Sequence, residues 1–325
     1  MRAISYQIPA DKSAAPTLKQ VELPVPQTTD GTVLVRVAYA GLSNFERETS
    51  EGKRNRSLAR LMKKLPVVSG IEMAGVVVRD TEKFKSGERV VGYTNIFRGP
   101  FFHADYAAVP ESKITHIPEN FSLHGAASII GGALTSITAL ERIADVRPGQ
   151  KVLVTGATGS VGITAVQLAS HLGAQVSGLC HSSATEFVLR EGAAIAYAYD
   201  SDDMPPENNQ FDVVFDAAPS LSFSASVGYL KARGTYITTM PHLDILGFLS
   251  SLLSRRKWGY LMEADTDSNR MSRLHALMSA GAFREVVDSI YPLAKASTAF
   301  AHQLDRGKRG KILIDFTVPA GSVEV

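Results

Sequence analysis

Residues 151–172 (KVLVTGATGSVGITAVQLASHL) constrain the fold more narrowly than any other stretch of the chain. The segment begins with VLVT, which is typical of a short buried parallel strand. Gly156, Gly159 and Gly162 follow, and apolar residues then recur at helical period from about Ser160. Glycines allow a sharp turn and the close approach of a phosphate, and the start of a helix offers N–H groups and a positive dipole end. This order predicts a dinucleotide site, the alternative being an ordinary strand-to-helix turn.

Length and composition narrow the class of protein. At 325 residues the chain is long for a single core, which predicts two domains. A net charge of +2, with one basic run at 53–60, argues against nucleic-acid binding as the main role. The single cysteine, Cys180, can form no internal disulfide. The N-terminus lacks the apolar core of a signal peptide, and no apolar run reaches the ~20 residues of a membrane span, so we expect a cytoplasmic protein.

Two kinds of pattern divide the chain. Residues 1–122 are rich in turns, with strands expected at 32–40, 73–79, 89–93, 104–110 and 114–117. Helices are then expected at 123–130 and 135–144, before strands and helices alternate. The alternating strands are expected at 152–155, 175–179, 194–198, 211–215, 234–239 and 259–262, and the helices at 160–172, 183–190, 221–230 and 243–253. This alternation predicts a doubly wound parallel sheet of six strands.

The last elements extend beyond that sheet. Helices are expected at 271–280 and 294–304, and a strand at 311–316. We expect this segment to return to the first domain. The predicted fold is α/β, with a β-rich domain formed by 1–122 and 264–325 and a dinucleotide-binding domain formed by 123–263. The dinucleotide is expected in the cleft between them, at the carboxyl ends of the strands.

The residues after the second strand of this sheet indicate which dinucleotide binds. In NAD sites a carboxylate about 20 residues beyond the glycines holds the ribose diol. Cys180, His181, Ser182 and Ser183 stand at that place, and none of them is acidic. Two hydroxyls and a histidine can accept a 2′-phosphate that a carboxylate would repel, so the pattern predicts NADPH rather than NADH. The nearest basic residue is Arg190, and a helix cap is the alternative role of the serines.

Four motifs carry a resemblance to a known family. They are GATGSVG (156–162), SGIEMAGVV (69–77), FDVVFDAA (211–218) and RGKILIDF (309–316). In their order and spacing the whole chain resembles the medium-chain dehydrogenase/reductases, and within them the zinc-independent quinone oxidoreductase, or zeta-crystallin-like, branch. The resemblance implies a GroES-like β-rich domain, a Rossmann domain, a C-terminal return to the first domain, and a homodimer.

The same resemblance bears on zinc. Zinc-dependent relatives carry a cysteine where this chain has Ser43, and a histidine where it has Ile71, between Gly70 and Glu72. They also carry a structural lobe of four cysteines, which this chain lacks. A catalytic zinc needs three protein ligands, so we expect no metal. The remaining chemistry is hydride transfer to an already activated acceptor, either a quinone or an α,β-unsaturated carbonyl.

The resemblance also assigns site residues. Asn44 and Thr135 are the predicted catalytic residues beside the nicotinamide, with an Asx turn and a helix cap as their alternative roles. Thr158 to Val161 are expected to give backbone N–H groups to the pyrophosphate. The full predicted cofactor set is Gly156, Thr158, Gly159, Ser160, Val161, Gly162, Cys180, His181, Ser182, Ser183, Ala217, Thr239, Gly310 and Lys311.

Two segments depart from the family pattern. Related quinone reductases place tyrosines after the Asn, whereas residues 46–64 contain none and are rich in cations that could meet an acidic substrate or form a solvated loop. Tyr93 and Phe97 are the predicted substrate wall, with core packing as the alternative. The apolar run 243–253 could cap the pocket, pack at a dimer interface beside the sixth strand, or touch a membrane.

Together these features predict a zinc-independent, NADPH-dependent reductase of quinones or enones that acts as a homodimer and has no nucleic-acid partner. Two alternatives stay open. The first is an enoyl or enone reductase of a biosynthetic pathway. The second is a sensor that binds NADPH without efficient chemistry.

Overall fold

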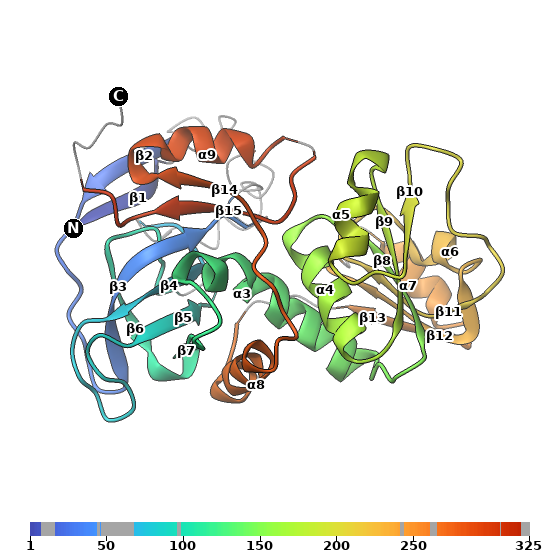
Figure 1. Cartoon of the computed structure of the whole chain (residues 1–325), viewed down its shortest axis with the longest axis horizontal. Coiled ribbons are helices and arrows are strands. Elements are labelled where there is room, and N and C mark those ends of the chain that lie inside the picture. Colours follow the sequence, from blue (N-terminus) through green and yellow to red (C-terminus); the bar gives the residue numbers. More distant parts are fainter. Residues whose placement is uncertain are drawn as a thin grey trace.

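The computed structural model describes residues 1–7, 17–43, 46, 68–95, 99–240, 244–260, 265–305 and 307–319. Two predicted site residues, Asn44 and Phe97, lie outside these ranges, as does the cationic segment 46–64 apart from Glu46. The described residues form two sheet-centred parts, and the helix α3 (Leu123–Ile137) runs between them (Figure 1).

The strands that follow residue 150 form one parallel sheet. Within the described ranges its six strands are β8 (Lys151–Thr155), β9 (Gln175–Cys180), β10 (Ile195–Ala198), β11 (Phe211–Asp216), β12 (Leu230–Thr238) and β13 (Lys257–Tyr260). Their order in space is β10-β9-β8-β11-β12-β13, and every pair is parallel. The order reverses at β8, which creates the switch point where doubly wound folds bind ligands. The predicted six-stranded Rossmann sheet is therefore confirmed.

This sheet is buried on both faces. Val152 and Val154 of β8 belong to one apolar cluster with α3 and α4, whereas Leu153 packs in a second cluster with Phe223 and Tyr236. Alternate residues of a strand point to opposite faces, so β8 is a central, doubly covered strand. The helices of this part are α4 (Ser160–His171), α5 (Thr185–Arg190), α6 (Phe223–Ser226) and α7 (Ile245–Ser251).

Several predicted elements have other bounds. The strand expected at 234–239 is β12, which begins at Leu230 and ends at Thr238. The helix expected at 221–230 is the single turn α6, because Ser222 caps it at Ala225 N and Leu230 already begins β12. The last strand of the sheet, β13, begins at Lys257 rather than at Gly259.

The β-rich part holds, among the described residues, a two-stranded sheet and a seven-stranded sheet. The first pairs β1 (Arg2–Gln7) with β2 (Thr17–Glu22). The second contains β3 (Thr32–Gly41), β4 (Glu72–Val77), β5 (Arg89–Tyr93), β6 (Tyr106–Pro110), β7 (Ile114–His116), β14 (Val287–Pro292) and β15 (Lys311–Asp315), ordered β14-β15-β3-β4-β5-β7 with β6 beside β3. β15 runs antiparallel to β3, so the end of the chain returns to the first sheet, as expected. The strands β1, β2 and β14 were not predicted.

The helices expected at 123–130 and 135–144 are one. α3 continues directly into the π-helical turn η2 (Thr138–Ile143). Gly131 and Gly132 lie in the middle, where an added Cβ would come within 2.7 Å of the Glu72 carboxyl carbon or 2.2 Å of the Ser160 carbonyl oxygen. These glycines allow close packing and do not end the helix.

This joined helix bears on the expectation that the chain has no membrane span. Among the described residues, Leu123–Ile143 is the one helix long and apolar enough to cross a membrane. The rest of the protein buries 83% of its most apolar window, as in a core helix.

The C-terminal elements pack on the β-rich part. In α8 (Ser268–Ser279), His275 Nδ1 lies 2.9 Å from the carbonyl oxygen of His116, beside β7. Lys113 forms an ion pair with Asp265 just before that helix. The helix α9 (Ala296–His302) lies against β14 and β15. Short 3-10 turns span Glu111–Lys113, Ser182–Ala184 and Leu293–Lys295. The domain boundaries at 122/123 and 263/264 stay a prediction.

Candidate active site

In the glycine loop after β8, one glycine has free space where its side chain would be. A Cβ on Gly156, whose φ is +59°, would lie 2.5 Å from Ala218 Cβ, and a Cβ on Gly162 would lie 2.1 Å from the Gly156 carbonyl oxygen. These two glycines are needed by the fold itself. At Gly159 an added Cβ would meet only the Gly156 carbonyl oxygen, at 3.5 Å. Gly159 is also the N-cap of α4 and has no side chain to cap it, so this helix start suits a phosphate.

The C-terminal segment reaches this loop. Gly310 N donates to the Thr158 carbonyl oxygen at 2.8 Å, and Gly159 and Gly310 form an isolated parallel bridge. Gly310 has a φ of +100°, and a Cβ there would lie 2.4 Å from the Val286 carbonyl oxygen. The predicted neighbours Thr158, Gly159 and Gly310 are therefore brought together, across a sequence separation of about 150 residues.

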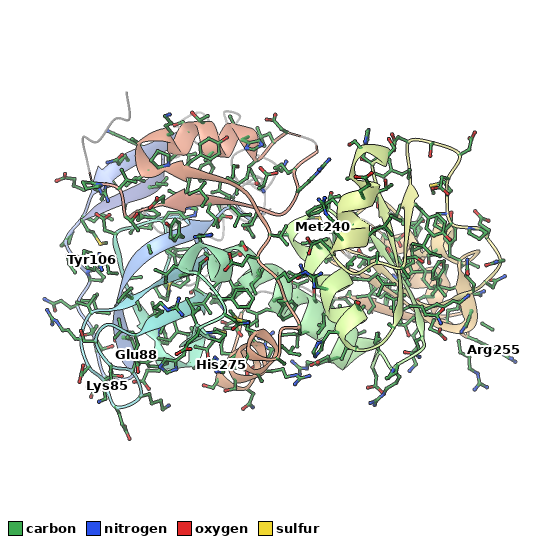
Figure 2. All side chains as sticks on the ribbon, viewed as in Figure 1. Lys85, Glu88, Tyr106, Met240, Arg255 and His275 are labelled. Carbon is green, nitrogen blue, oxygen red and sulfur yellow. The ribbon has the colours of Figure 1, made fainter. Side chains whose placement is uncertain are left out.

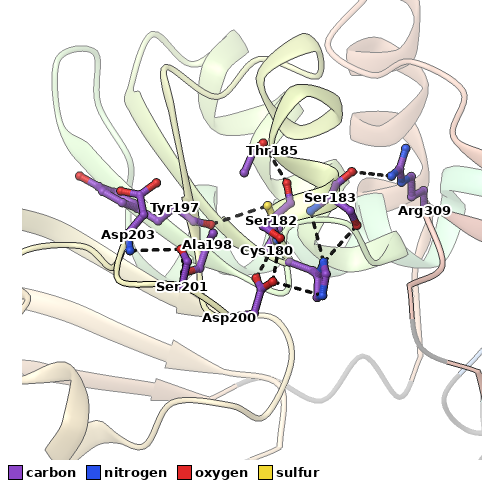
Figure 3. Close-up of polar contacts among 11 residues, drawn as sticks. Cys180, Ser182, Ser183, Thr185, Tyr197, Ala198, Asp200, Ser201, Asp203 and Arg309 are labelled. Atoms are coloured by element: carbon purple, nitrogen blue, oxygen red, sulfur yellow. Dashed lines mark hydrogen bonds and ion pairs between the residues drawn. The ribbon is translucent and has the colours of Figure 1, made fainter.

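A carboxylate stands where the sequence predicted none. Asp200, just after β10, accepts hydrogen bonds from Ser182 N and Ser182 Oγ, both at 2.7 Å, and lies 3.3 Å from His181 Nε2 (Figure 3). These hydrogen bonds lower the pKa of Asp200, so this carboxyl is ionised at neutral pH. His181 Nδ1 accepts from Ser183 N at 3.2 Å, so the cap of this turn is His181 and not one of the serines to which the alternative role had been given.

A cation stands on the other side of the same turn. The Arg309 guanidinium donates to the Ser183 carbonyl oxygen at 2.6 Å (Figure 3). It also lies 5.8 Å from the centre of the Phe187 ring. Arg309 and Phe187 also line a hollow of about 400 Å³ between α5 and the segment 285–309. The sequence points to Arg190 and does not show Arg309, because residues 126 positions apart meet only in the folded chain.

Several predicted residues point into the core. Cys180 is 1% exposed, and burial raises the pKa of its thiol to about 11, so any nucleotide contact would have to use its backbone. Thr135 is buried and its Oγ1 donates to the Gly131 carbonyl oxygen, within its own helix. Tyr93 is 4% exposed and belongs to the main apolar cluster, which matches its alternative role in core packing.

The turn after β11 is held by an acid. Asp216 accepts from Thr155 Oγ1 at 2.6 Å and from Ser220 N at 3.2 Å, and burial raises its pKa to about 6. Thr239 N donates to the Asp216 carbonyl oxygen at 3.4 Å. Ala217 and Thr239 therefore lie beside each other at the carboxyl ends of β11 and β12, where they were predicted to line the nicotinamide side.

Lys311 has a partner inside the protein. Its ammonium donates to Glu72 Oε1 at 2.7 Å, and the two side chains are 3% and 2% exposed. The other oxygen, Glu72 Oε2, accepts from Gly131 N at 3.2 Å. Removing one member of such a pair leaves a buried unpaired charge. Lys311 therefore joins β15 to β4, and its amine is engaged by Glu72.

Comparisons with known proteins agree with this architecture. Residues 29–119 match the family described as "Alcohol dehydrogenase GroES-like domain", and residues 192–314 match the one described as "Zinc-binding dehydrogenase". The chain belongs to the medium-chain dehydrogenase/reductases, in their quinone oxidoreductase branch. It is 28% identical over 329 residues to "Quinone-oxidoreductase QR1, chloroplastic" of Triphysaria versicolor, covering 97% of this chain and 98% of that protein. It is 26% identical to "2-methylene-furan-3-one reductase" of Solanum lycopersicum, covering 97% and 79%.

Solved structures show the same fold. The quinone oxidoreductase from Coxiella burnetii superimposes with a TM-score of 0.82 at 24% identity, covering 97% of this chain and 99% of that one. The CurF ER cyclopropanase from the curacin A biosynthetic pathway superimposes with a TM-score of 0.77 at 19% identity, covering 96% and 98%.

The second family match is described as a zinc-binding dehydrogenase, and a catalytic zinc requires three protein ligands. The positions equivalent to two zinc ligands hold Ser43 and the apolar Ile71, and the carboxylate of Glu72 is already bound by Lys311. Within the described ranges there is no group of three His, Cys, Asp or Glu side chains placed to hold a metal ion. These donors do not fit a catalytic zinc.

Proposed function

We propose that the protein is an oxidoreductase that uses NADPH to reduce quinones or α,β-unsaturated carbonyl compounds without a metal. The open position at Gly159, at the start of α4 and beside Gly310, carries this proposal. It leaves room for a pyrophosphate where both neighbouring glycines are required by the fold. The quinone oxidoreductase and enone reductase relatives support the acceptor class.

The residues of this chain bind the dinucleotide, orient the acceptor and stabilise the charge that forms on it. The loop 156–162 holds the pyrophosphate with backbone N–H groups. At the carboxyl ends of β11 and β12, Ala217 and Thr239 line the place of the nicotinamide ring. A bound dihydronicotinamide supplies the hydride. The protein's task is then to orient the acceptor and to stabilise the negative charge that develops on its oxygen.

The choice between NADPH and NADH depends on two opposed charges. The Arg309 guanidinium can pair with a 2′-phosphate, whereas the Asp200 carboxylate repels it and engages Ser182. We favour NADPH because the Arg309 guanidinium lies at the turn after β9, beside the Ser183 carbonyl oxygen, where the adenosine ribose is expected to bind. We further propose that the protein works as a homodimer in the cytoplasm.

The decisive experiment is to follow the oxidation of NADPH and NADH with a panel of quinones and enones, with a chelator present throughout. We expect turnover with NADPH. The variant Gly159→Leu should lose NADPH binding because its side chain fills the open position, whereas Ala232→Leu, at an exposed position of β12, serves as the surface control. NADPH binding that is unchanged in Gly159→Leu would refute the site.

The two alternatives give other outcomes of the same panel. A biosynthetic enoyl or enone reductase would reduce enones and leave quinones untouched. A sensor would bind NADPH tightly and reduce nothing.

A further inference from the structure

Ser43 occupies a particular place in the fold. It is the partly exposed residue just beyond β3. Its neighbour Leu42 donates its backbone N–H to the Ile312 carbonyl oxygen at 3.0 Å, which fixes the end of β3 beside the start of β15. Two residues before Ile312, Gly310 contacts the glycine loop. Ser43 therefore lies at the end of the β-rich sheet that faces the dinucleotide site.

The buried side chain of Glu46 is hydrogen-bonded to this serine. Glu46 Oε2 accepts a hydrogen bond from Ser43 N at 2.8 Å and another from Ser43 Oγ, although the side chain is 0% exposed. Glu88 makes the same local contact, accepting from Lys85 N at 2.7 Å, but its side chain is 37% exposed. A carboxylate that caps a turn is ordinarily solvated, as Glu88 is at the outer edge of the β-rich part (Figure 2).

The surroundings of the two acids explain their opposite titration. Burial raises the pKa of Glu46 to about 7, although the hydrogen bonds from Ser43 lower it, and the Glu72 carboxylate adds to the rise. For Glu88 the hydrogen bond from Lys85 lowers the pKa. The described charged groups near Glu46 are Glu72 on β4 and, paired with it, Lys311 on β15. Burial, which is the largest cause of the rise, therefore favours the neutral form of Glu46 below about pH 7.

We propose that Ser43 and Glu46 form the proton source for the reduction, with Ser43 Oγ as the catalytic donor to the acceptor's oxygen and Glu46 as the positioning acid behind it. The inference rests on the proposed function. Reduction of an enone puts a hydride on the β-carbon and moves the π electrons to the oxygen, which becomes an enolate. In the resting protein the Ser43 hydroxyl donates to Glu46 Oε2, and it turns toward the acceptor when the acceptor binds. The Ser43 O–H bond then breaks as its proton moves to the acceptor's oxygen, while the Glu46 carboxyl turns its own proton toward Ser43 Oγ and transfers it there, which leaves Glu46 as a carboxylate. Solvent returns a proton to Glu46, and the enol relaxes to the ketone.

The pair of Ser43 and Glu46 supplies a proton donor, for which the sequence offered no candidate. Residues 46–64 contain no tyrosine that could donate a proton. Ser43 stands where zinc-dependent relatives carry a zinc ligand. In this chain the Ser43 hydroxyl, hydrogen-bonded to Glu46, takes the place of the zinc ion in stabilising the charge on the acceptor's oxygen.

The test measures kcat/KM for an enone with the wild-type protein, Glu46→Gln, Ser43→Ala and the double variant, as a function of pH. Glutamine keeps the size of the side chain and can still accept from Ser43 N, but it cannot donate a carboxyl proton. We expect kcat/KM of the wild type to fall as the pH rises through about 7. Glu46→Gln should lose that pH dependence and ~100-fold or more in rate. Because the two groups act as a unit, the double variant should be no worse than Ser43→Ala.

The matched control is Glu88→Gln, which makes the same substitution at an exposed acid that has the same local contact, and it should leave the pH profile unchanged. A second readout needs no turnover. Infrared difference spectra of the free protein should show a protonated carboxyl on the acid side of pH 7 that is missing in Glu46→Gln. An unchanged pH profile in Glu46→Gln, or the absence of that carboxyl band, would overturn the inference while wild-type enone reduction leaves the proposed function standing. No reduction of any acceptor would remove both.

Discussion

At the scale of single residues, the preference for one dinucleotide should depend on Asp200 and Arg309. Asp200→Asn removes the charge that repels a 2′-phosphate and keeps a hydrogen-bond acceptor for Ser182. We expect the ratio of NADPH to NADH affinity to rise by roughly 10-fold, the size of one modest electrostatic interaction of about 1.4 kcal/mol. Arg309→Gln should move the ratio the other way. Titration of both nucleotides by fluorescence quenching measures it, and equal shifts for NADPH and NADH would contradict this assignment.

A buried histidine should make stability depend on pH. His103 is 0% exposed, with Nδ1 2.7 Å from Ser69 Oγ and Nε2 3.1 Å from the Gly41 carbonyl oxygen. Burial lowers its pKa from 6.5 to about 4, so the fold holds the neutral ring. The unfolded chain binds a proton below pH 6.5 and the folded one does not. The resulting stability is complete above pH 6.5 and is lost as the pH falls toward 4, by up to about 3 kcal/mol.

Chemical denaturation of the wild type and His103→Gln across that window tests this expectation. The difference in unfolding free energy between the two proteins should shrink as the pH falls from 6.5 toward 4. A difference that does not change with pH would contradict it. Glu46 provides an internal contrast. Its raised pKa makes folding less favourable as the pH rises from 4.5 to about 7, so the wild type should lose stability relative to Glu46→Gln over that range.

The residue scale also shows what a sequence can predict about a site. Gly156, Gly159 and Gly162 are predictable because the glycine spacing and the strand and helix around it are local. Asp200 and Arg309 are not, since each approaches Ser182 or Ser183 from a distant part of the chain. Glu46 was treated as part of a cationic loop, because a sequence does not show that one acid of a charged run is fully buried.

At the scale of elements, the packing of α3 on α4 depends on one missing side chain. A Cβ on Gly132 would lie 2.2 Å from the Ser160 carbonyl oxygen, at the start of α4. We expect Gly132→Ala to destabilise the fold by about 1–3 kcal/mol, despite alanine's better helix propensity, because the two helices must separate. Gly159→Ala is the matched control, as its Cβ would meet nothing closer than 3.5 Å. Equal thermal midpoints for both variants would contradict this explanation.

Elements were predictable where burial gave a regular pattern. Strands of the doubly covered sheet form apolar runs such as VLVT and DVVF, and these were found within a residue or two. β14 has the sequence VDSIYP and contains no residue that is fully buried, so its apolar pattern is weak. The break expected between two helices after residue 130 was wrong for a physical reason. Gly131 and Gly132 pack closely against Glu72 and Ser160, two residues that are distant from them in the sequence.

At the scale of the whole molecule, one surface is unusually apolar. Seven of the fourteen exposed large hydrophobic residues of the described chain gather in α7 and around β13: Ile245, Leu246, Phe248, Leu249, Leu252, Leu253 and Tyr260. β13 is the last strand of its sheet and pairs only with β12 within the described ranges, so its other edge can accept a strand. Arg255, from the same connection, extends outward at this end of the molecule (Figure 2). An open edge beside an apolar helix suits a second copy of the chain related by a twofold axis.

This surface makes the proposed homodimer testable. Leu246 is 81% exposed and Leu253 is 95% exposed, so Leu246→Glu and Leu253→Glu should leave the fold of one chain intact. In a dimer both charges would be buried without partners, which should shift the equilibrium to the monomer by several kcal/mol. Sedimentation equilibrium should then give twice the mass of one chain for the wild type and the mass of one chain for the double variant. Val25→Glu, at an isolated position that is 46% exposed, should remain dimeric. A monomeric wild type would reject the dimer, and in that case binding to vesicles of anionic lipid becomes the expected use of these leucines and the cations that follow them.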